Sequence, residues 1–305
     1  MSRFTLTAIT SLLLAGGAPA QGVDRDVERV FYEAFFVDQG LKEKERGLTL
    51  YRRFLALAPD HPLAGQAARL AIKILEKGGE DEAVKAMAAK HAAIMAETIP
   101  VGINSSYLDP NANVTTFVRR FEAESREVFK NRRALVKLMG LQEGQTVADI
   151  GAGTGFFSNL FARAVGPDGA VLAVEIAPTL IPHLRAMGEN MKLANLKVVR
   201  CTARSTELEA GSVDVAFICD VYHHFAYPAD TMKSLYRAMR PGGQLFVIDF
   251  ERIPGVSRPW VLDHVRAGKG VFRSEIEAAG FVSVRELKPD FLEENYILQF
   301  AKRAQ

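Results

Sequence analysis

The chain has 305 residues, of which 48% are hydrophobic and 24% are charged. This composition is typical of a globular protein and excludes collagen-like, low-complexity and wholly disordered chains. The 38 basic and 36 acidic residues give a formal net charge of +2, too balanced for a nucleic-acid-binding protein that neutralises many phosphates. The two cysteines, Cys201 and Cys219, exclude a disulfide-stapled scaffold and a zinc site made of cysteines alone. We expect no metal site and no nucleic-acid partner.

The first 20 residues have the pattern of a secretory signal peptide. Arg3 precedes an uncharged, largely apolar stretch, and the small residues Ala18 and Ala20 suit a signal peptidase. We predict cleavage after Ala20 and export to the periplasm or out of the cell. The alternative is an uncleaved membrane anchor, but the apolar centre is shorter than the roughly 20 residues that span a bilayer. We expect no membrane association once the signal is removed.

Residues 24–98 predict short amphipathic helices, because apolar side chains recur at steps of three and four residues. Breaks occur around Pro59 and at Gly78. The segment from Leu50 to Leu75 resembles part of a tetratricopeptide-type helical hairpin, and a plain helical bundle is the alternative, since one unit does not make a repeat array. We expect this module to be the part of the chain that could contact a peptide or protein.

One long helix is predicted from Val114 to Met139, with many basic residues. A solvated face is the simplest account of these charges. The alternative is that Arg126, Arg132 or Arg133 turns toward an anionic group.

Beyond residue 140, β-rich runs alternate with segments of helical period, which predicts a doubly wound parallel sheet covered by helices. The expected strands are 146–150, 170–175, 197–201, 213–219 and 244–250, and the expected helices are 156–165, 180–194 and 230–239. The last two strand-like runs, 281–287 and 296–301, are joined by a loop alone and should pair antiparallel.

The strongest local signal is a glycine-rich loop after the first strand. Asp149 lies near the end of that strand, and Gly151, Gly153 and Gly155 follow at alternate positions. Such a loop lets the backbone turn sharply and leaves no Cβ to block a ligand. A dinucleotide-binding fingerprint would need its third glycine where this chain has Phe156. The loop instead resembles the first motif of the class I S-adenosylmethionine-dependent methyltransferases.

Three further motifs follow in the order of this family. The second strand ends in Glu175, where a carboxylate can accept hydrogen bonds from both hydroxyls of a ribose. The run 213–225 resembles the family's fourth strand and the loop after it, and 235–247 resembles its helix, glycine turn and fifth strand. The resemblance covers about residues 121–302 and implies a Rossmann-like fold, S-adenosylmethionine as the cofactor and methyl transfer as the activity.

The resemblance also implies which residues hold the cofactor. The three glycines would lie against its methionine part, and Asp149 would hold the loop and the amino group. Glu175 would bind the ribose, and Ile176 would lie against the adenine. The loop after the third strand lacks the family's usual acidic residue and carries Arg204, which we do not expect to bind the cofactor.

The loop after the fourth strand carries the candidate catalytic residues. Asp220, Tyr222 and His223 should border the transferred methyl group. His223 is our candidate general base, because imidazole titrates near neutral pH. The alternative is that these side chains only shape the pocket.

Three cationic or titratable residues, His264, Arg266 and Lys269, lie after the fifth strand. Loops at this position lie over the carboxyl ends of the strands. These side chains could select an acidic substrate, and a solvated loop is the simpler interpretation.

We therefore predict an S-adenosylmethionine-dependent methyltransferase with a small-molecule acceptor. A finer resemblance, carried by 125–127, 220–225, the His-x-Arg segment at His264 and 294–298, is to a subgroup of exported methyltransferases with no settled substrate. The alternatives are a non-catalytic scaffold with a peptide-binding helical module, and a nicotinamide oxidoreductase, which Phe156 disfavours.

The predicted organisation is a signal peptide, a helical module, a linker and a methyltransferase domain, at 1–20, 21–99, 100–113 and 114–305. In the family's strand order, Cys201 and Cys219 end strands that have two others between them, about 14 Å apart. This separation is beyond disulfide reach, so we expect two free, buried thiols.

Overall fold

The structure is a computed structural model that describes residues 23–97, 99, 100, 102–253 and 255–304. The chain divides into two compact units, Met1–Glu97 and Thr98–Gln305. The signal peptide predicted over residues 1–20 lies outside the described residues. Within the described residues, no helix is long and apolar enough to cross a membrane.

The described part of the first unit consists of helices joined by short turns. Its elements are α2 (Val23–Phe35), the π-helical η1 (Phe36–Gly40), α3 (Lys44–Leu57), α4 (Ala64–Gly78), α5 (Asp81–Lys90) and α6 (Ala92–Glu97). Its core is built on Phe31, Tyr51 and Phe54, which are fully buried between α2, α3 and α4. The predicted amphipathic helices are confirmed, except that the stretch from 81 to 97 breaks at His91 into two helices.

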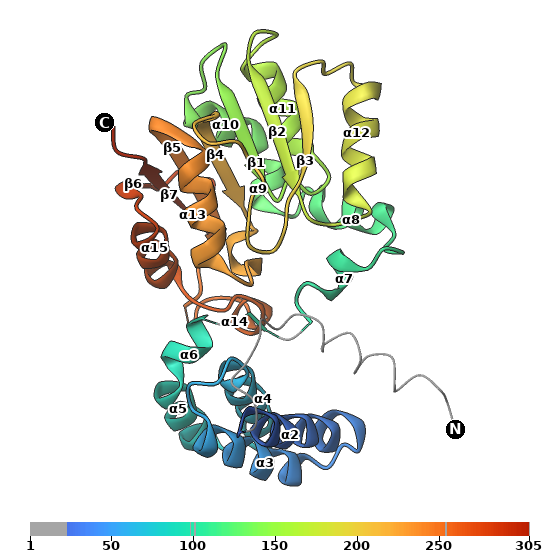
Figure 1. Cartoon of the computed structure of the whole chain (residues 1–305), viewed down its shortest axis with the longest axis vertical. Helices are drawn as coiled ribbons and strands as arrows, with labels where there is room; N and C mark the ends of the chain where they lie inside the picture. The colour runs from blue at the N-terminus through green and yellow to red at the C-terminus, as the bar shows by residue number, and fades with distance from the viewer. Residues whose placement is uncertain (1–22, 98, 101, 254, 305) are drawn as a thin grey trace. The chain divides into compact units, whose positions relative to one another are not determined.

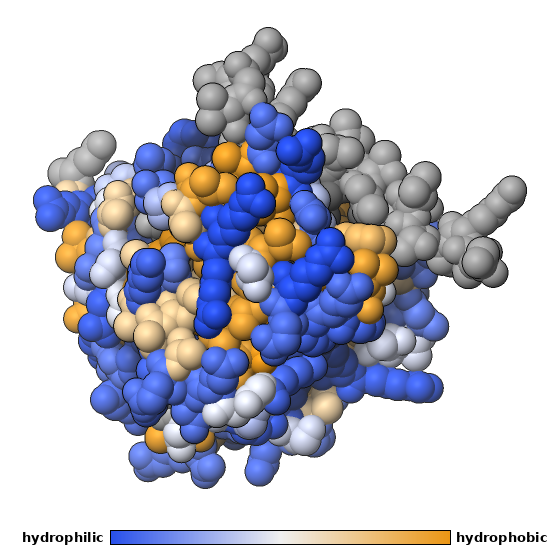
Figure 2. All heavy atoms as spheres, turned by 90° about the horizontal axis from the view of Figure 1, so that it is seen from below, coloured by the Kyte–Doolittle hydropathy of each residue, from blue (hydrophilic) through white to orange (hydrophobic). Residues whose placement is uncertain are grey.

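Apolar side chains on the surface of the first unit are interspersed with charged ones. Phe36, Leu41 and Leu57 are each about half exposed. Figure 2 shows the molecule from below, where orange hydrophobic areas lie among blue hydrophilic residues. Contact with a peptide through residues 24–98 stays a prediction.

The second unit is an α/β domain, whose arrangement can be followed in Figure 1. Its helices are α7 (Ser105–Leu108), α8 (Val114–Phe121), α9 (Glu127–Lys130), α10 (Arg132–Met139), α11 (Phe156–Ala164), α12 (Leu180–Asn190), η2 (Tyr222–His224), α13 (Pro228–Ala238), α14 (Pro259–His264) and α15 (Lys269–Ala278). Its strands are β1 (Thr146–Ile150), β2 (Ala170–Glu175), β3 (Leu196–Arg200), β4 (Val213–Cys219), β5 (Met239–Phe250), β6 (Val282–Leu287) and β7 (Asn295–Ala301).

These strands form one seven-stranded sheet in the order β3-β2-β1-β4-β5-β7-β6. The first five are parallel, with Val147 of β1 paired to Val171 of β2 and to Val215 of β4. β7 runs antiparallel to both β5 and β6. The predicted doubly wound sheet and the antiparallel C-terminal pair are confirmed.

The strand order reverses direction at β1 and β4, and this positions the site. β2 and β3 extend to one side of β1 while β4 and β5 extend to the other. The loops that leave the carboxyl ends of β1 and β4 therefore diverge, and ligands of open α/β sheets bind in the resulting crevice. An apolar cluster that includes Phe157, Phe161 and Phe217 packs α11 against the strands beneath this edge.

The prediction of one helix from Val114 to Met139 is wrong. The structure divides this segment into α8, α9 and α10. Arg126, between α8 and α9, has an extended backbone (φ −86°, ψ 120°), and its guanidinium contacts the carboxylate of Asp220. The alternative that one of these arginines reaches an anionic group is thus confirmed for Arg126.

Two smaller expectations concern residues 100–113 and the two cysteines. Residues 100–113, expected as a linker, belong to the second unit and contain α7. Cys201 and Cys219 are free, as predicted, and both are half-buried. Burial raises the pKa of Cys201 to about 12, so its thiol is protonated and unreactive at neutral pH.

Candidate functional site

The glycine loop follows β1 and lies against the loop that follows β4. Gly151 has φ +71°, and a Cβ at this position would lie only 2.6 Å from Cγ1 of Val221. Gly155 has φ +84° and equally little space, since a Cβ would meet Leu184 at 2.7 Å. Glycine is therefore favoured by backbone conformation at both ends of this loop, and by close packing at Gly151, whereas the side-chain ends of Leu184 and Met187 near Gly155 can move.

Glu175 joins the glycine loop to the loop after β2. It is buried, and its carboxylate accepts hydrogen bonds from the backbone N–H groups of Gly153 (2.8 Å), Ile176 (2.8 Å) and Ala177 (2.9 Å). Burial raises the pKa of Glu175, although the three amide donors oppose this. A carboxylate has about four acceptor positions, so about one is left for a ribose hydroxyl. The predicted bonds to both hydroxyls would require one of the amide bonds to be released.

Asp149 was also predicted to hold the glycine loop. Its side chain points toward α11, the helix that follows this loop. Its buried carboxylate accepts a hydrogen bond of 2.5 Å from the hydroxyl of Ser158 in α11. Burial raises the pKa of Asp149 to about 7, and the bond from Ser158 opposes this shift. The carboxyl group therefore ties the end of β1 to α11, and its predicted bond to the cofactor's amino group stays a prediction.

Aromatic side chains from α7 and α8 cover this part of the sheet edge. Tyr107, Phe117 and Phe121 stack on one another with ring centroids 5.5–6.2 Å apart, and they pack against Ala177 after β2. A Cβ at Gly153 would lie 3.5 Å from the ring of Phe121. The segment ahead of β1 thus forms a wall over the glycine loop.

A cavity of about 310 Å³ lies beside this wall, at the carboxyl ends of β4 and β5. Its volume is at the lower end of that of small-molecule sites. Side chains from five separate segments line it: Tyr107, Arg120, Phe121, Arg126, Glu127, Val128, Asp220, His223, His224, Phe250, Arg258, Trp260, His264, Glu294 and Asn295.

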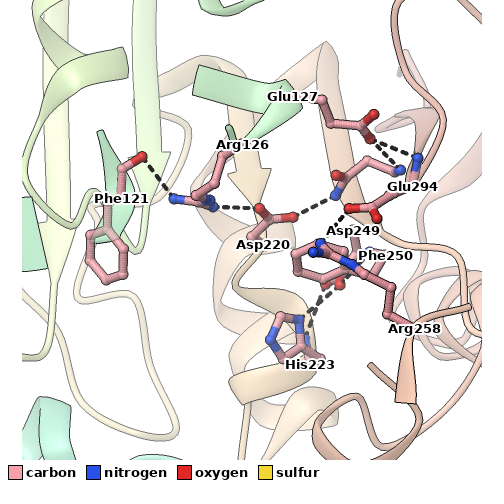
Figure 3. Close-up of polar contacts among 10 residues, drawn as sticks. Phe121, Arg126, Glu127, Asp220, His223, Asp249, Phe250, Arg258 and Glu294 are labelled. Atoms are coloured by element: carbon pink, nitrogen blue, oxygen red, sulfur yellow. Dashed lines mark hydrogen bonds and ion pairs between the residues drawn. The ribbon is translucent and has the colours of Figure 1, made fainter. Parts of the chain in front are cut away.

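A network of charged groups fixes one wall of the cavity (Figure 3). Arg126 donates to Asp220 at 2.5 Å and to the carbonyl oxygen of Phe121 at 3.0 Å. The side-chain amide of Asn295 donates to the other oxygen of Asp220 at 2.6 Å. Burial raises the pKa of Asp220, and the guanidinium of Arg126 opposes this rise. Both oxygens of Asp220 are thus engaged in positioning the wall.

Three histidines also line the cavity. Nδ1 of His223 lies 2.8 Å from Oδ1 of Asp249, a fully buried residue of β5. Nδ1 of His224 lies 2.8 Å from the side-chain oxygen of Asn104. Burial and the neighbouring cations lower the pKa of His224 far below its usual range and that of His264 to about 4. Both of these rings are therefore neutral at pH 7.

Residues 148–247 match the model of a methyltransferase domain family. The chain is 28% identical over 122 residues to the ubiquinone/menaquinone biosynthesis C-methyltransferase UbiE of Citrobacter koseri, covering 40% of this chain and 49% of that protein. It is 30% identical over 125 residues to UbiE of Ectopseudomonas mendocina, covering 41% and 48%. It thus spans about half the length of the curated relatives that it matches.

The fold agrees with that of a solved methyltransferase. A crystal structure of an S-adenosylmethionine-dependent methyltransferase from Aquifex aeolicus superposes with a TM-score of 0.55 at 22% identity, over 62% of this chain and 98% of that one. The second unit therefore has a Rossmann-like methyltransferase fold and contains the matched methyltransferase domain at residues 148–247. In this methyltransferase domain, the cavity lies at the edge of the sheet, next to the glycine loop.

The methyltransferase domain does not bring all three predicted catalytic residues into the cavity. His223 and Asp220 line it, whereas Tyr222 is fully buried outside the lining and its hydroxyl donates to Glu275 at 3.0 Å. Burial raises the pKa of Tyr222, and the carboxylate of Glu275 raises it further. The position of Tyr222 supports a packing role.

The interpretation of the segment after β5 as a solvated loop is wrong for two of its residues. His264 lines the cavity, and Arg266 is buried with two hydrogen bonds to Glu275. Lys269 is half-buried and forms ion pairs with Glu251 and Glu286. Arg204, which we did not expect to bind the cofactor, pairs with Asp230 on the surface.

Sequence reasoning missed the residues that orient the histidines and Asp220. Asn104, Asp249 and Asn295 come from segments far apart in the sequence, and only the fold shows that they meet. Asp249 carried a usable signal, because an acidic residue near the end of a hydrophobic strand had already pointed to Glu175.

Proposed function

We propose that this chain transfers a methyl group from S-adenosylmethionine to a small-molecule acceptor bound in the cavity of the methyltransferase domain. One observation carries the proposal: Val221, in the loop that also bears Asp220 and His223, packs directly against Gly151. The cavity and the glycine loop therefore share one wall. A cofactor at the glycine loop would have its methyl group close to an acceptor in the cavity, as in-line transfer requires.

The reaction needs an acceptor atom in line with the sulfonium methyl group and a group that takes up the acceptor's proton. The new bond joins the acceptor atom to the methyl carbon, while the old bond's electron pair returns to sulfur. His223, oriented by Asp249, is the side chain that we expected as the base. In this proposal His223 takes up the acceptor's proton.

The lining of the cavity favours a small, partly aromatic acceptor. Phe121, Phe250 and Trp260 supply apolar surface, while Arg120 and Arg258 supply positive charge. The relatives are named as C-methyltransferases of ubiquinone and menaquinone biosynthesis. Their names do not identify the acceptor of this chain. A non-catalytic scaffold is not favoured, because the glycine loop and Glu175 are intact.

We also propose that the chain is exported, on the strength of the signal-peptide pattern in residues 1–20. Mass spectrometry of the protein purified from its native cells would find an amino terminus at Gln21. An intact Met1 on the purified protein would contradict export by cleavage.

Calorimetric titration of the full chain tests the cofactor. We expect S-adenosylmethionine to bind at micromolar concentration and NAD not to bind. Glu175→Ala should weaken binding by about 1–3 kcal/mol, because it leaves the ribose hydroxyls without their acceptor. Glu175→Gln keeps the side-chain shape, and Glu189→Ala on the exposed face of α12 is the control. Folded protein that binds no S-adenosylmethionine, or that binds NAD equally well, would overturn the proposal.

A further inference from the structure

His223, His224 and His264 form a compact cluster on the wall of the cavity. Their ring centroids lie 4.3, 5.2 and 5.1 Å apart, and one nitrogen of each ring lies within 4.8 Å of the others. The nitrogens of a tetrahedral zinc site, each about 2.0–2.1 Å from the ion, are about 3.4 Å apart. Small rotations of the three side chains would bring the nitrogens from their present separation to that of a zinc site.

The surroundings of two of the rings are those of metal-binding histidines. A histidine ligand almost always donates its other N–H to a carboxylate or a carbonyl oxygen, which fixes the tautomer and the ring orientation. His223 has Asp249 at its Nδ1, and His224 has the side-chain oxygen of Asn104 at its Nδ1. Asn104 also donates to the backbone oxygen of His224 at 2.9 Å. Nε2 of both rings is therefore left with its lone pair free.

Among the described residues, the ring of His264 makes no hydrogen bond that would compete with a metal ion. Neither nitrogen of His264 has a hydrogen-bond partner there, and the ring is only half-buried, 5.8 Å from that of Trp260. His264 comes from α14, whereas the other two come from η2. The cluster thus combines side chains from two segments, with the carboxylate of Asp249 behind His223. A bound cation would hold the two segments together.

We propose that His223, His224 and His264 bind one divalent transition-metal ion, Zn²⁺ by the preference of three imidazole ligands. All three residues line the cavity, so an open coordination position on the ion would be accessible to a molecule bound there. Arg120, which acts on His224 and His264 electrostatically, opposes the ion's charge, and the buried carboxylate of Asp249 favours it. This proposal differs from the expectation from sequence that the chain has no metal site.

The ion's role in methyl transfer rests on the proposed function. An acceptor hydroxyl or thiol that binds Zn²⁺ at the open position would release its proton to water more readily. The resulting anion would attack the sulfonium methyl group, forming the bond to carbon as the carbon–sulfur bond breaks. His223 would then act as a metal ligand instead of accepting the proton itself.

Metal binding is measured on the full chain after treatment with a chelator. We expect one equivalent of Zn²⁺ per chain by calorimetry and by elemental analysis, and an X-ray absorption spectrum with imidazole nitrogens at about 2.0 Å. Co²⁺ should quench the fluorescence of Trp260, the single tryptophan. A chain that takes up no Zn²⁺ at one equivalent would overturn the proposal.

Variants decide whether the ion binds at this cluster. His264→Ala should weaken Zn²⁺ binding at least 10-fold, and Asn104→Ala, which removes the partner of His224, should weaken it about 10- to 100-fold. His183→Ala, a histidine of α12 outside the cluster, is the control and should bind as the unaltered chain does. Equal affinity in His264→Ala and in the unaltered chain would overturn the assignment, provided that circular dichroism shows both to be folded.

The same variant separates this inference from the proposed function. His264 does not contact the glycine loop, so His264→Ala should bind S-adenosylmethionine with unchanged affinity. A chain that binds S-adenosylmethionine and no Zn²⁺ contradicts the metal site alone. A chain that binds Zn²⁺ and no S-adenosylmethionine contradicts the proposed function alone.

Discussion

The guanidinium of Arg126 lies 2.5 Å from the carboxylate of Asp220, and this ion pair joins the segment ahead of β1 to the loop after β4. The backbone of Asp220 has φ +53°, a conformation that costs a non-glycine residue about 1–2 kcal/mol. Asn295, at the start of β7, holds the second oxygen of the same carboxylate. Asp220 therefore connects three segments at the wall of the cavity.

We expect Arg126→Ala to destabilise the methyltransferase domain by about 3 kcal/mol at pH 8, because a buried carboxylate loses its cation. The loss should be smaller at pH 5. Without the guanidinium, the pKa of Asp220 rises further above its usual value, so the carboxyl group is protonated in the folded state at low pH and ionised at high pH. Denaturant unfolding followed by the fluorescence of Trp260 measures both values.

A second substitution tests whether the stranded charge causes this loss. Arg126→Ala combined with Asp220→Asn should recover most of the stability at pH 8, because no charge is then buried. Arg119→Ala, on the exposed side of α8, is the control and should stay within about 0.5 kcal/mol of the unaltered chain. Equal losses at the two pH values would argue against the ion pair.

The sequence predicted the sheet well because its strands are short apolar runs whose pattern does not depend on the rest of the fold. It could also predict the glycine loop and Glu175, which lie within single motifs. The segment from 114 to 139 could not be divided from sequence, since the partner of Arg126, which lies between α8 and α9, is 94 positions away. Asn104, Asp249 and Asn295 were missed for the same reason: their roles come from tertiary contacts.

Gly151 allows a test of close packing in the glycine loop. Gly151→Ala should destabilise the domain by about 3 kcal/mol or more, since it combines the strain of φ +71° with a Cβ 2.6 Å from Val221. Gly144 has φ +81° and open space around its Cα, so Gly144→Ala should show the strain alone, about 1 kcal/mol. Thermal unfolding of both variants measures the difference.

Shortening Val221 should relieve the contact but leave the strain. Gly151→Ala with Val221→Ala is therefore expected to approach the stability of Gly144→Ala combined with Val221→Ala. If the second substitution gives no recovery, the two loops do not pack as described.

The raised pKa of Asp149 predicts how stability depends on pH. Its folded-state pKa is about 7, against an ordinary value of 3.8, so the folded chain holds a proton between these values that the unfolded chain has lost. Stability should therefore fall as pH rises from about 4 to 7, and the loss persists above 7. Asp149→Asn should remove on the order of 3 kcal/mol of this fall, measured by denaturant unfolding at pH 5 and pH 8.

Other carboxyl groups also titrate in this range, so the comparison needs a matched variant. Asp168→Asn changes an exposed aspartate in the loop before β2 and should leave the slope of stability against pH unchanged. An Asp149→Asn variant with the slope of the unaltered chain would show that Asp149 is ionised throughout.

Glu127, in the first turn of α9, connects that helix to the start of β7. Its carboxylate accepts hydrogen bonds from the backbone N–H groups of Glu293 (2.7 Å), Glu294 (2.9 Å) and Asn295 (2.6 Å). Glu127→Ala removes all three bonds and should destabilise the domain by about 2–3 kcal/mol. It should also speed hydrogen exchange at these three amides, because they are left without an acceptor. Glu124→Ala, three positions earlier and exposed, loses only a surface ion pair with Arg132 and should change neither. If exchange rises across the whole domain and not at 293–295 first, Glu127 acts through global stability instead of through this local connection.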